Sequence, residues 1–273
     1  ILKCGSESLN SSKALLNCLH TSLKKHKLPK NCIGLLATSN RKEVANLLKM
    51  DEYIDVVVPR GGKSLIQAIS KISKIPVIKH LDGICHTYID NNSNMLMAKK
   101  VVHNAKMRRT GICGATETLL VSKKIANSHV PQIIDILINS GCEIRGDNFI
   151  KKIDSRVKKA TLKDWETEYL APIISIKIVK DVKEAIQHIN QYGSNHTDAI
   201  ITSNKKNAKL FLDNIDSSIV MHNTSTQFAD GGEFGMGAEI GISTGKLHAR
   251  GPVGADQLTT FKYIVKGKGQ LRS

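Results

Sequence analysis

The sequence predicts an α/β fold built on a doubly wound parallel sheet. Short apolar runs with the character of buried strands alternate with amphipathic helical patterns, and the links between them are short. The length of 273 residues is enough for two domains and a sizeable core. We therefore expect successive βαβ units that form parallel sheets.

The first part of the chain supplies one such series. Ile1 to Lys3 ends a strand, and Ser8, Asn10 and Ser11 offer N-caps for a helix to about Lys25. The elements expected next are a strand at 33–37, a helix at 42–49, strands at 54–58, 76–78 and 84–89, a helix at 64–73, and a helix beginning near residue 94.

The alternation resumes after Cys113. We expect helices at 123–140, 182–192 and 204–214, strands at 173–179, 198–202 and 219–222, and a polar, irregular stretch at 143–165. This second α/β series places a domain boundary near Arg109, which gives domains at 1–108 and 109–242.

The remaining segment, 243–273, forms a third part. It follows a glycine-rich stretch at 230–239, which indicates backbone packed close to a ligand or another loop. A basic loop at 246–252 precedes a final strand at 261–265, an edge that pairs elsewhere.

The charge balance favours small anionic ligands over nucleic acid. The chain has 40 basic and 24 acidic residues, a net charge of +16, but its lysines fall in scattered doublets and aromatic residues make up only 4%. A nucleic-acid surface would concentrate basic residues and interleave aromatic ones. A basic field of this kind still attracts phosphates.

Other classes find little support. No apolar run approaches the roughly 18 residues that span a membrane, and the start, which is not Met, lacks the order of a secretory signal. The six cysteines include no C-x-x-C pair and no histidine at metal spacing, so we expect no metal and a reducing cytoplasm.

One cysteine lies in a setting suited to nucleophilic chemistry. Cys113 follows a turn through Thr110 and Gly111, and Arg108 and Arg109 precede it by five and four residues. A nearby cation favours the thiolate, which is the nucleophilic form. The alternative is a small buried hydrophobe at the start of a strand.

A second feature is the turn at 58–64, which follows a predicted strand and opens a helix. Its glycines permit close backbone approach, the first amides of the helix suit a phosphate, and Arg60 and Lys63 add positive charge. An ordinary strand-to-helix turn also uses paired glycines.

Four segments together resemble those of gamma-glutamyl phosphate reductases, a branch of the aldehyde dehydrogenase superfamily. They are VPRGG at 58–62, the stretch 104–121 around the cysteine, 230–239, and KLHARGP at 246–252. The resemblance implies three-layer sheets in two lobes, the first lacking its N-terminal portion. It also implies a homo-oligomer, with the terminal strand at 261–265 joining a neighbour's sheet.

The resemblance implies an activity as well: reduction of L-glutamate 5-phosphate, an acyl phosphate, to L-glutamate 5-semialdehyde with NADPH, in cytoplasmic proline biosynthesis. Cys113 matches the family's nucleophile, which forms a thioester. The remaining roles fall on cofactor-binding residues Lys3, Ser6, Arg60, Gly61, Gly62 and Glu168, and on substrate-binding residues Arg108, Arg109, Phe234 and Gly235. Structural alternatives are a solvated carboxylate for Glu168 and a core anchor for Phe234.

The resemblance also locates an absent base. Hydrolytic aldehyde dehydrogenases have a water-activating glutamate where this chain reads KHLDG at 79–83. A reductase of acyl phosphates must keep water from its thioester, so this loss is chemically sensible. His80 and His86 are alternative bases, or structural histidines.

Two other functions compete with the reductase. The first is a non-catalytic remnant that binds at most nucleotide or a partner, since family members begin with a further segment. The second is a cysteine hydrolase, for which no orienting partner stands at recognisable spacing.

Overall fold

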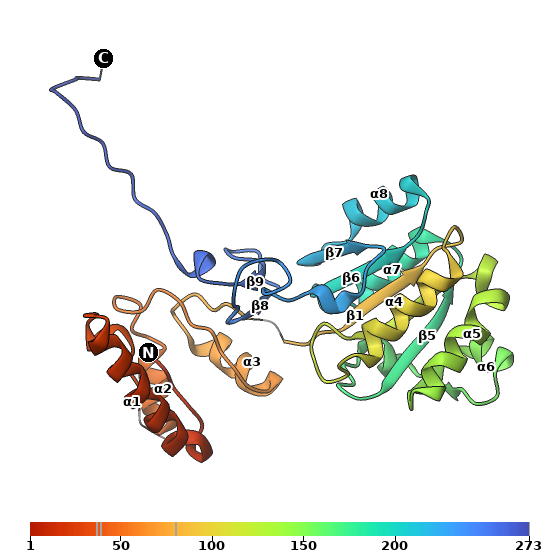
Figure 1. Cartoon of the computed structure of the whole chain (residues 1–273), viewed down its shortest axis with the longest axis horizontal. Coiled ribbons are helices and arrows are strands. Elements are labelled where there is room, and N and C mark those ends of the chain that lie inside the picture. Colours follow the sequence, from red (N-terminus) through yellow and green to blue (C-terminus); the bar gives the residue numbers. More distant parts are fainter. Residues whose placement is uncertain (37, 39, 80, 273) are drawn as a thin grey trace. The chain divides into compact units, whose positions relative to one another are not determined.

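A computed structural model describes residues 1–36, 38, 40–79 and 81–272 of the chain (Figure 1). The chain forms two compact units, Ile1–Val77 and Ile78–Ser273. This division comes earlier than the boundary expected near Arg109. The reason is that strand β1 (Cys85–Ile89) pairs with β2 (Thr116–Ser122) and β6 (Thr197–Ile201), so it belongs to the second unit.

The second unit is built on a seven-stranded sheet, in which every pair of neighbouring described strands is parallel. The strand order is β4-β3-β5-β2-β1-β6-β7. The strands not yet given are β3 (Glu143–Gly146), β4 (Lys158–Lys159), β5 (Ile173–Val179) and β7 (Ile219–His222). The predicted α/β fold class with a parallel sheet is confirmed.

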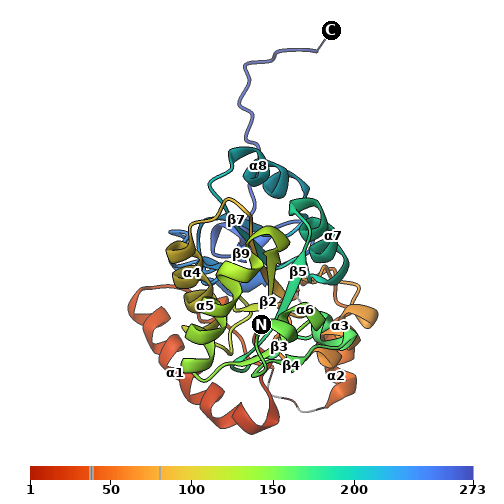
Figure 2. The same cartoon turned by 90° about the vertical axis from the view of Figure 1, so that its right-hand side faces the viewer.

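Helices cover both faces of this sheet, as the doubly wound arrangement requires (Figure 2). Three pack on one face: α4 (Met95–Met107), α5 (Ala126–Asn139) and α6 (Asn148–Ile153). Two pack on the other: α7 (Val182–Tyr192) and α8 (Lys205–Asn214).

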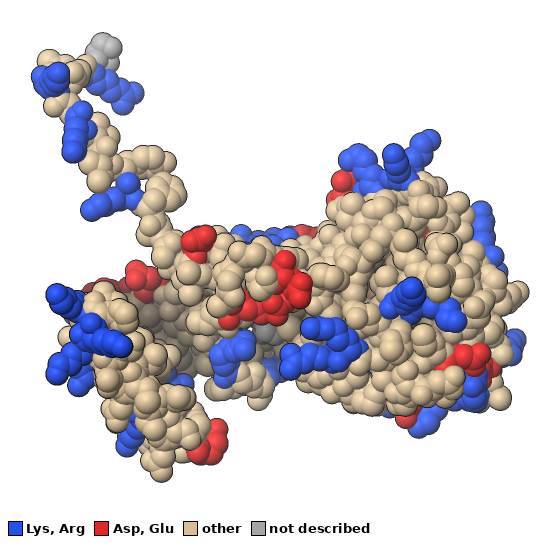
Figure 3. All heavy atoms as spheres, viewed as in Figure 1, with Lys and Arg blue, Asp and Glu red and all other residues tan. Residues whose placement is uncertain are grey.

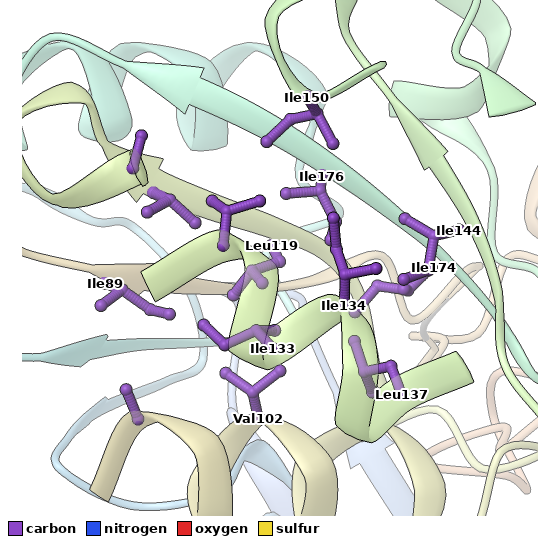
Figure 4. Close-up of a cluster of buried hydrophobic side chains, with 14 of the residues drawn as sticks. Ile89, Val102, Leu119, Ile133, Ile134, Leu137, Ile144, Ile150, Ile174 and Ile176 are labelled. Atoms are coloured by element: carbon purple, nitrogen blue, oxygen red, sulfur yellow. The ribbon is translucent and has the colours of Figure 1, made fainter. Parts of the chain in front are cut away.

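Side chains along the central strands point alternately to the two faces of the sheet, where they form two hydrophobic cores. Ile89 and Leu119 point to the face that α4 and α5 cover, where Ile133 meets them (Figure 4). Their neighbours Tyr88 and Leu120 point to the opposite face and pack among α7 and α8. Because successive strand residues face opposite ways, side chains on both faces of these strands are buried.

The first unit contains three helices in the described residues, α1 (Leu9–Lys25), α2 (Arg41–Leu47) and α3 (Lys63–Ile72), with short 3₁₀ turns at Ser6–Ser8 and Lys30–Cys32. The strands expected here are reduced to two isolated parallel bridges, Leu2 with Leu35 and Val57 with Val77. Because these segments pair at one position each, they do not extend into strands. Ala37, in one expected strand, lies outside the described residues.

The expectation of an irregular stretch at 143–165 is wrong. This stretch contains β3, α6, β4 and a 3₁₀ turn at Leu162–Glu166. Its elements are short, and Asp147 caps α6 by accepting hydrogen bonds from the amides of Phe149 and Ile150. The stretch is rich in polar residues, and its buried apolar residues, such as Ile144 and Ile150, are too widely spaced to show a period.

The C-terminal part forms a small antiparallel pair, β8 (Gly241–Ser243) with β9 (Gly251–Val253), flanked by 3₁₀ turns at Thr226–Phe228 and Asp256–Leu258. The strand expected at 261–265 is extended and exposed, and it pairs with no strand in the described chain. Its pairing elsewhere stays a prediction.

The surface carries its basic residues in separate groups on the face of the second unit that Figure 3 shows. Among the described helices, none combines the length and apolar character needed to cross a membrane.

Candidate active site around Cys113

Cys113 lies in the loop that joins the end of α4 to the start of β2. Its side chain is half-buried and packs against an apolar cluster that includes Met221, Ala229 and Ile242. Gly83 lies just before β1. Because β1 and β2 are parallel neighbours, the turns that precede them meet at the same edge of the sheet.

The loop opens onto a hollow of about 330 Å³ within the second unit. Cys113 lines it together with Arg108 and Arg109, so the structure brings the predicted nucleophile and the predicted substrate-binding arginines to one cavity. The other side chains at the hollow include three carboxylates and one amide, Asp230, Glu233, Glu239 and Gln227. A cavity with both charges suits a small zwitterionic or phosphorylated ligand.

Two residues, Gly83 and Cys85, contact the backbone of Cys113. Gly83 approaches it so closely that a Cβ on Gly83 would lie 2.2 Å from the Cys113 carbonyl oxygen. The Cys85 thiol donates a hydrogen bond to that same oxygen at 3.0 Å. Burial raises the pKa of Cys85 well above its ordinary value, which keeps this thiol protonated as a donor.

Glu168 is brought to the same place. Its Oε1 accepts a hydrogen bond from the Gly83 amide at 2.9 Å. The predicted cofactor carboxylate therefore contacts the turn on which Cys113 rests.

Gln227 fixes the arginine-bearing segment and was not singled out by the sequence. Its Nε2 donates to the carbonyl oxygens of Ala105 at 2.9 Å and Arg109 at 3.3 Å, and its Oε1 accepts from Arg108 Nη1 at 3.4 Å. Buried and polar, it belongs to a 3₁₀ turn capped by Ser225. That Ser-Thr-Gln pattern is a weak local signal.

The predicted substrate-binding residues Phe234 and Gly235 are not among those that line the hollow. Phe234 is 46% exposed, and Gly235 adopts a φ of +72° that favours glycine. The loop turns here, and the wall that it contributes comes from Asp230, Glu233 and Glu239 instead. The sequence pattern located the loop and not these carboxylates.

The other predicted cofactor-binding residues lie in the first unit. Gly62 is the N-cap of α3, with no side-chain cap hydrogen bond, and Gly61 has a φ of +148°. A Cβ on Gly62 would meet nothing within 4 Å, so the start of this helix is open, with Arg60 beside it. Lys3 Nζ donates to the Cys4 carbonyl at 2.7 Å, and Ser6 Oγ donates to Glu7 at 3.5 Å.

Of the two alternative bases, only His86 lies in the described part of the chain, and it does not line the hollow. His86 is buried on β1, and its Nδ1 lies 3.1 Å from Asp198 Oδ1, a structural pairing. His80 lies outside the described residues. Among the residues that the structure describes, no group of three or more His, Cys, Asp or Glu is placed to hold a metal ion.

The fold is that of the aldehyde dehydrogenases. The aldehyde dehydrogenase family model matches residues 155–262. An acetylating aldehyde dehydrogenase from Geobacillus thermoglucosidasius superposes with a TM-score of 0.75 at 17% identity, over 99% of this chain and 69% of that one.

Within that class, the chain is similar along its whole length to gamma-glutamyl phosphate reductases, which confirms the resemblance. The enzyme of that name from Paramagnetospirillum magneticum is 54% identical over 272 residues. The crystal structure of the Thermotoga maritima enzyme superposes with a TM-score of 0.95 at 43% identity, over 98% of this chain and 65% of that one. The chain spans about 64% of the length of the curated relative.

Proposed function

We propose that this chain carries the cysteine-bearing part of a gamma-glutamyl phosphate reductase, an oxidoreductase of proline biosynthesis. The observation that carries the proposal is Cys113, half-buried in a hollow that Arg108 and Arg109 also line, in a chain 54% identical to enzymes of that name. The substrate is L-glutamate 5-phosphate and the product L-glutamate 5-semialdehyde.

The chemistry begins at the Cys113 sulfur. The thiolate attacks the acyl carbon, the bond from that carbon to the phosphate oxygen breaks, and inorganic phosphate leaves with the electron pair, so a thioester remains. Arg108 and Arg109 attract the anionic substrate into the hollow and offset charge on the phosphate.

When bound, NADPH would supply the hydride that reduces the thioester carbon and leaves a thiohemiacetal on Cys113. The chain contributes the open, glycine-bordered start of α3, which fits a phosphate group, and Glu168, the predicted partner of the nicotinamide ribose. The preference for NADPH over NADH rests on the resemblance. Collapse of that thiohemiacetal would break the carbon–sulfur bond, release the aldehyde and return the thiolate.

Several expectations remain part of this proposal. They are the cytoplasmic location, a homo-oligomer, and the assignment of 1–108 to a partial dinucleotide domain, 109–242 to a catalytic domain and 243–273 to a returning segment. Phe234 and Gly235 remain proposed substrate contacts, as do Lys3 and Ser6 for the cofactor.

The competing function is a non-catalytic remnant that binds at most nucleotide or a partner. The reverse reaction separates the two: semialdehyde, phosphate and NADP are supplied to the chain and NADPH formation is followed by absorbance. We expect turnover that Cys113→Ala abolishes. A chain without turnover, whose melting temperature nevertheless rises with NADPH, would be the remnant.

Alkylation of the thiols tests the nucleophile directly. Iodoacetamide should label Cys113 faster than the exposed Cys18 and Cys32, with each site followed by peptide mass spectrometry. Equal labelling of the three would count against a nucleophilic role.

A further inference from the structure

A buried ion pair closes the base of the Cys113 loop. Lys106 lies in the last turn of α4 and Glu117 is the second residue of β2, so the whole loop lies between them. Lys106 Nζ and Glu117 Oε2 are 2.5 Å apart, and both side chains are fully buried. A buried ion pair is seldom more stabilising than apolar packing of the same volume. Its presence therefore calls for another explanation than stability.

The second oxygen of Glu117 reaches a different segment. Glu117 Oε1 accepts a hydrogen bond from the Leu170 amide at 3.3 Å. Leu170 has a φ of +51°, a conformation that a leucine adopts only when its surroundings hold it there. Lys106 Nζ also lies 5.9 Å from the centre of the Tyr169 ring. The pair thus holds the segment that presents Glu168.

That segment returns to the cysteine. Glu168 accepts from the Gly83 amide at 2.9 Å, and Gly83 packs directly on the Cys113 backbone. These contacts form a continuous chain. Glu117, at the end of the Cys113 loop, binds the 168–170 segment, and Glu168 of that segment binds Gly83, which packs on Cys113 itself.

We propose that Lys106 and Glu117 are positioning residues that hold the Cys113 turn and Glu168 in a fixed relation to each other. The consequence for catalysis rests on the proposed function, in which Cys113 holds the acyl group and Glu168 the nicotinamide ribose. A hydride donor and its acceptor must be held in close alignment for transfer. One buried pair sets both positions.

Two double variants of the chain separate positioning from stability. Lys106→Met with Glu117→Leu replaces the ion pair by apolar side chains and removes the acceptor of the Leu170 amide. Lys106→Met with Glu117→Gln is equally uncharged and keeps a carbonyl oxygen for that amide. Leu137→Ala, at a buried core position of α5, serves as a control that lowers stability elsewhere.

Hydrogen exchange reports the coupling without any activity. In the Met/Leu variant we expect faster exchange of the Gly83 amide, whose own acceptor Glu168 is intact, together with faster exchange across 108–115. In the Met/Gln variant the Gly83 amide should remain protected. The proposal is overturned if the melting temperature of the Met/Leu variant lies between those of the wild type and Leu137→Ala while its Gly83 amide keeps native protection from exchange. A Met/Leu variant that does not fold leaves the Met/Gln variant to decide, since loss of Gly83 protection there also overturns it.

Alkylation adds the functional consequence. The faster labelling of Cys113 relative to Cys18 and Cys32 should be lost in the Met/Leu variant and retained in the Met/Gln and Leu137→Ala variants. Persistence in the Met/Leu variant would overturn the positioning role. If wild-type Cys113 shows no such advantage, the proposed nucleophile fails, and the exchange data still judge the coupling.

Discussion

Cys113 owes its surroundings to residues far away in the chain. The sequence identifies the cysteine and its two arginines because all three lie within the six consecutive residues 108–113. Gly83 and Gln227 contact this loop only after β1 and β2 pair and the chain returns from β7. No local pattern encodes such contacts, which is why the sequence singles out Cys113 as the predicted nucleophile and misses the residues that contact its loop.

The closest of these supports gives the first prediction. Gly83→Ala would place a methyl group 2.2 Å from the Cys113 carbonyl oxygen, against backbone that cannot rotate away. We expect a loss of about 1–3 kcal/mol in the free energy of unfolding, from overpacking, together with the loss of fast Cys113 alkylation. Urea unfolding and peptide-resolved labelling measure the two effects.

Gly34→Ala is the matched control, because a Cβ there meets nothing within 4 Å. It should leave both quantities unchanged. Native stability and labelling in Gly83→Ala would show that this close approach does not constrain the cysteine.

A second prediction concerns the pH dependence of stability. Burial raises the pKa of Glu117 to about 7, although Lys106 opposes the shift and Glu168 adds to it. Between the ordinary value of 4.5 and about 7 the folded chain holds a proton that the unfolded chain releases. The contribution of Glu117 to the free energy of unfolding should therefore fall as pH rises through this range.

Urea unfolding between pH 4.5 and pH 7 tests this sign. Glu117→Gln should flatten the pH profile in that range. Glu143 provides the contrast, because hydrogen bonds from Lys158 and Arg145 lower its pKa, so Glu143→Gln should alter the profile at lower pH and with the opposite sign. An unchanged slope in Glu117→Gln would contradict the assignment.

At the scale of elements, sequence patterns succeed where an element has its own period and cap. The ranges expected for β5, α7 and β7 match the structure, and Asp181 and Asn204 cap α7 and α8 through their side chains. Patterns fail in two places. In the first unit, expected strands meet a partner at only one position, and at 143–165 the elements are too short to show a period.

The cap of α6 supplies the prediction at this scale. Asp147 accepts from the amides of Phe149 and Ile150 through Oδ1, and from the Ile178 amide at 2.8 Å through Oδ2. Asp147→Ala would remove the cap and an anchor to β5, so we expect a loss of about 1–2 kcal/mol measured by urea unfolding. Asp147→Asn, which keeps an acceptor oxygen, should lose less. Equal losses in both variants would show that charge and not the hydrogen bonds matters.

At the scale of the whole molecule, the fold class was predictable because the alternation of strand and helix runs through most of the chain. The position of the division between units was not. It depends on which sheet β1 joins, and only its parallel pairing with β2 and β6 decides that. The segment 261–265 shows the same limit, since it pairs with no strand among the residues that the structure describes.

That segment gives the last prediction. Phe261, Tyr263, Ile264 and Val265 are 71–90% exposed, and unpaired extended backbone with apolar side chains is prone to pair with another chain. We expect the chain to self-associate through 261–265, in keeping with the homo-oligomer proposed above. Removing residues 260–273 should convert the larger species to a monomer in sedimentation velocity, without lowering the stability of the seven-stranded unit. Removing 267–273 alone leaves the apolar segment in place and should preserve the association. A chain whose sedimentation is the same with and without residues 260–273 would assign the contact to another surface.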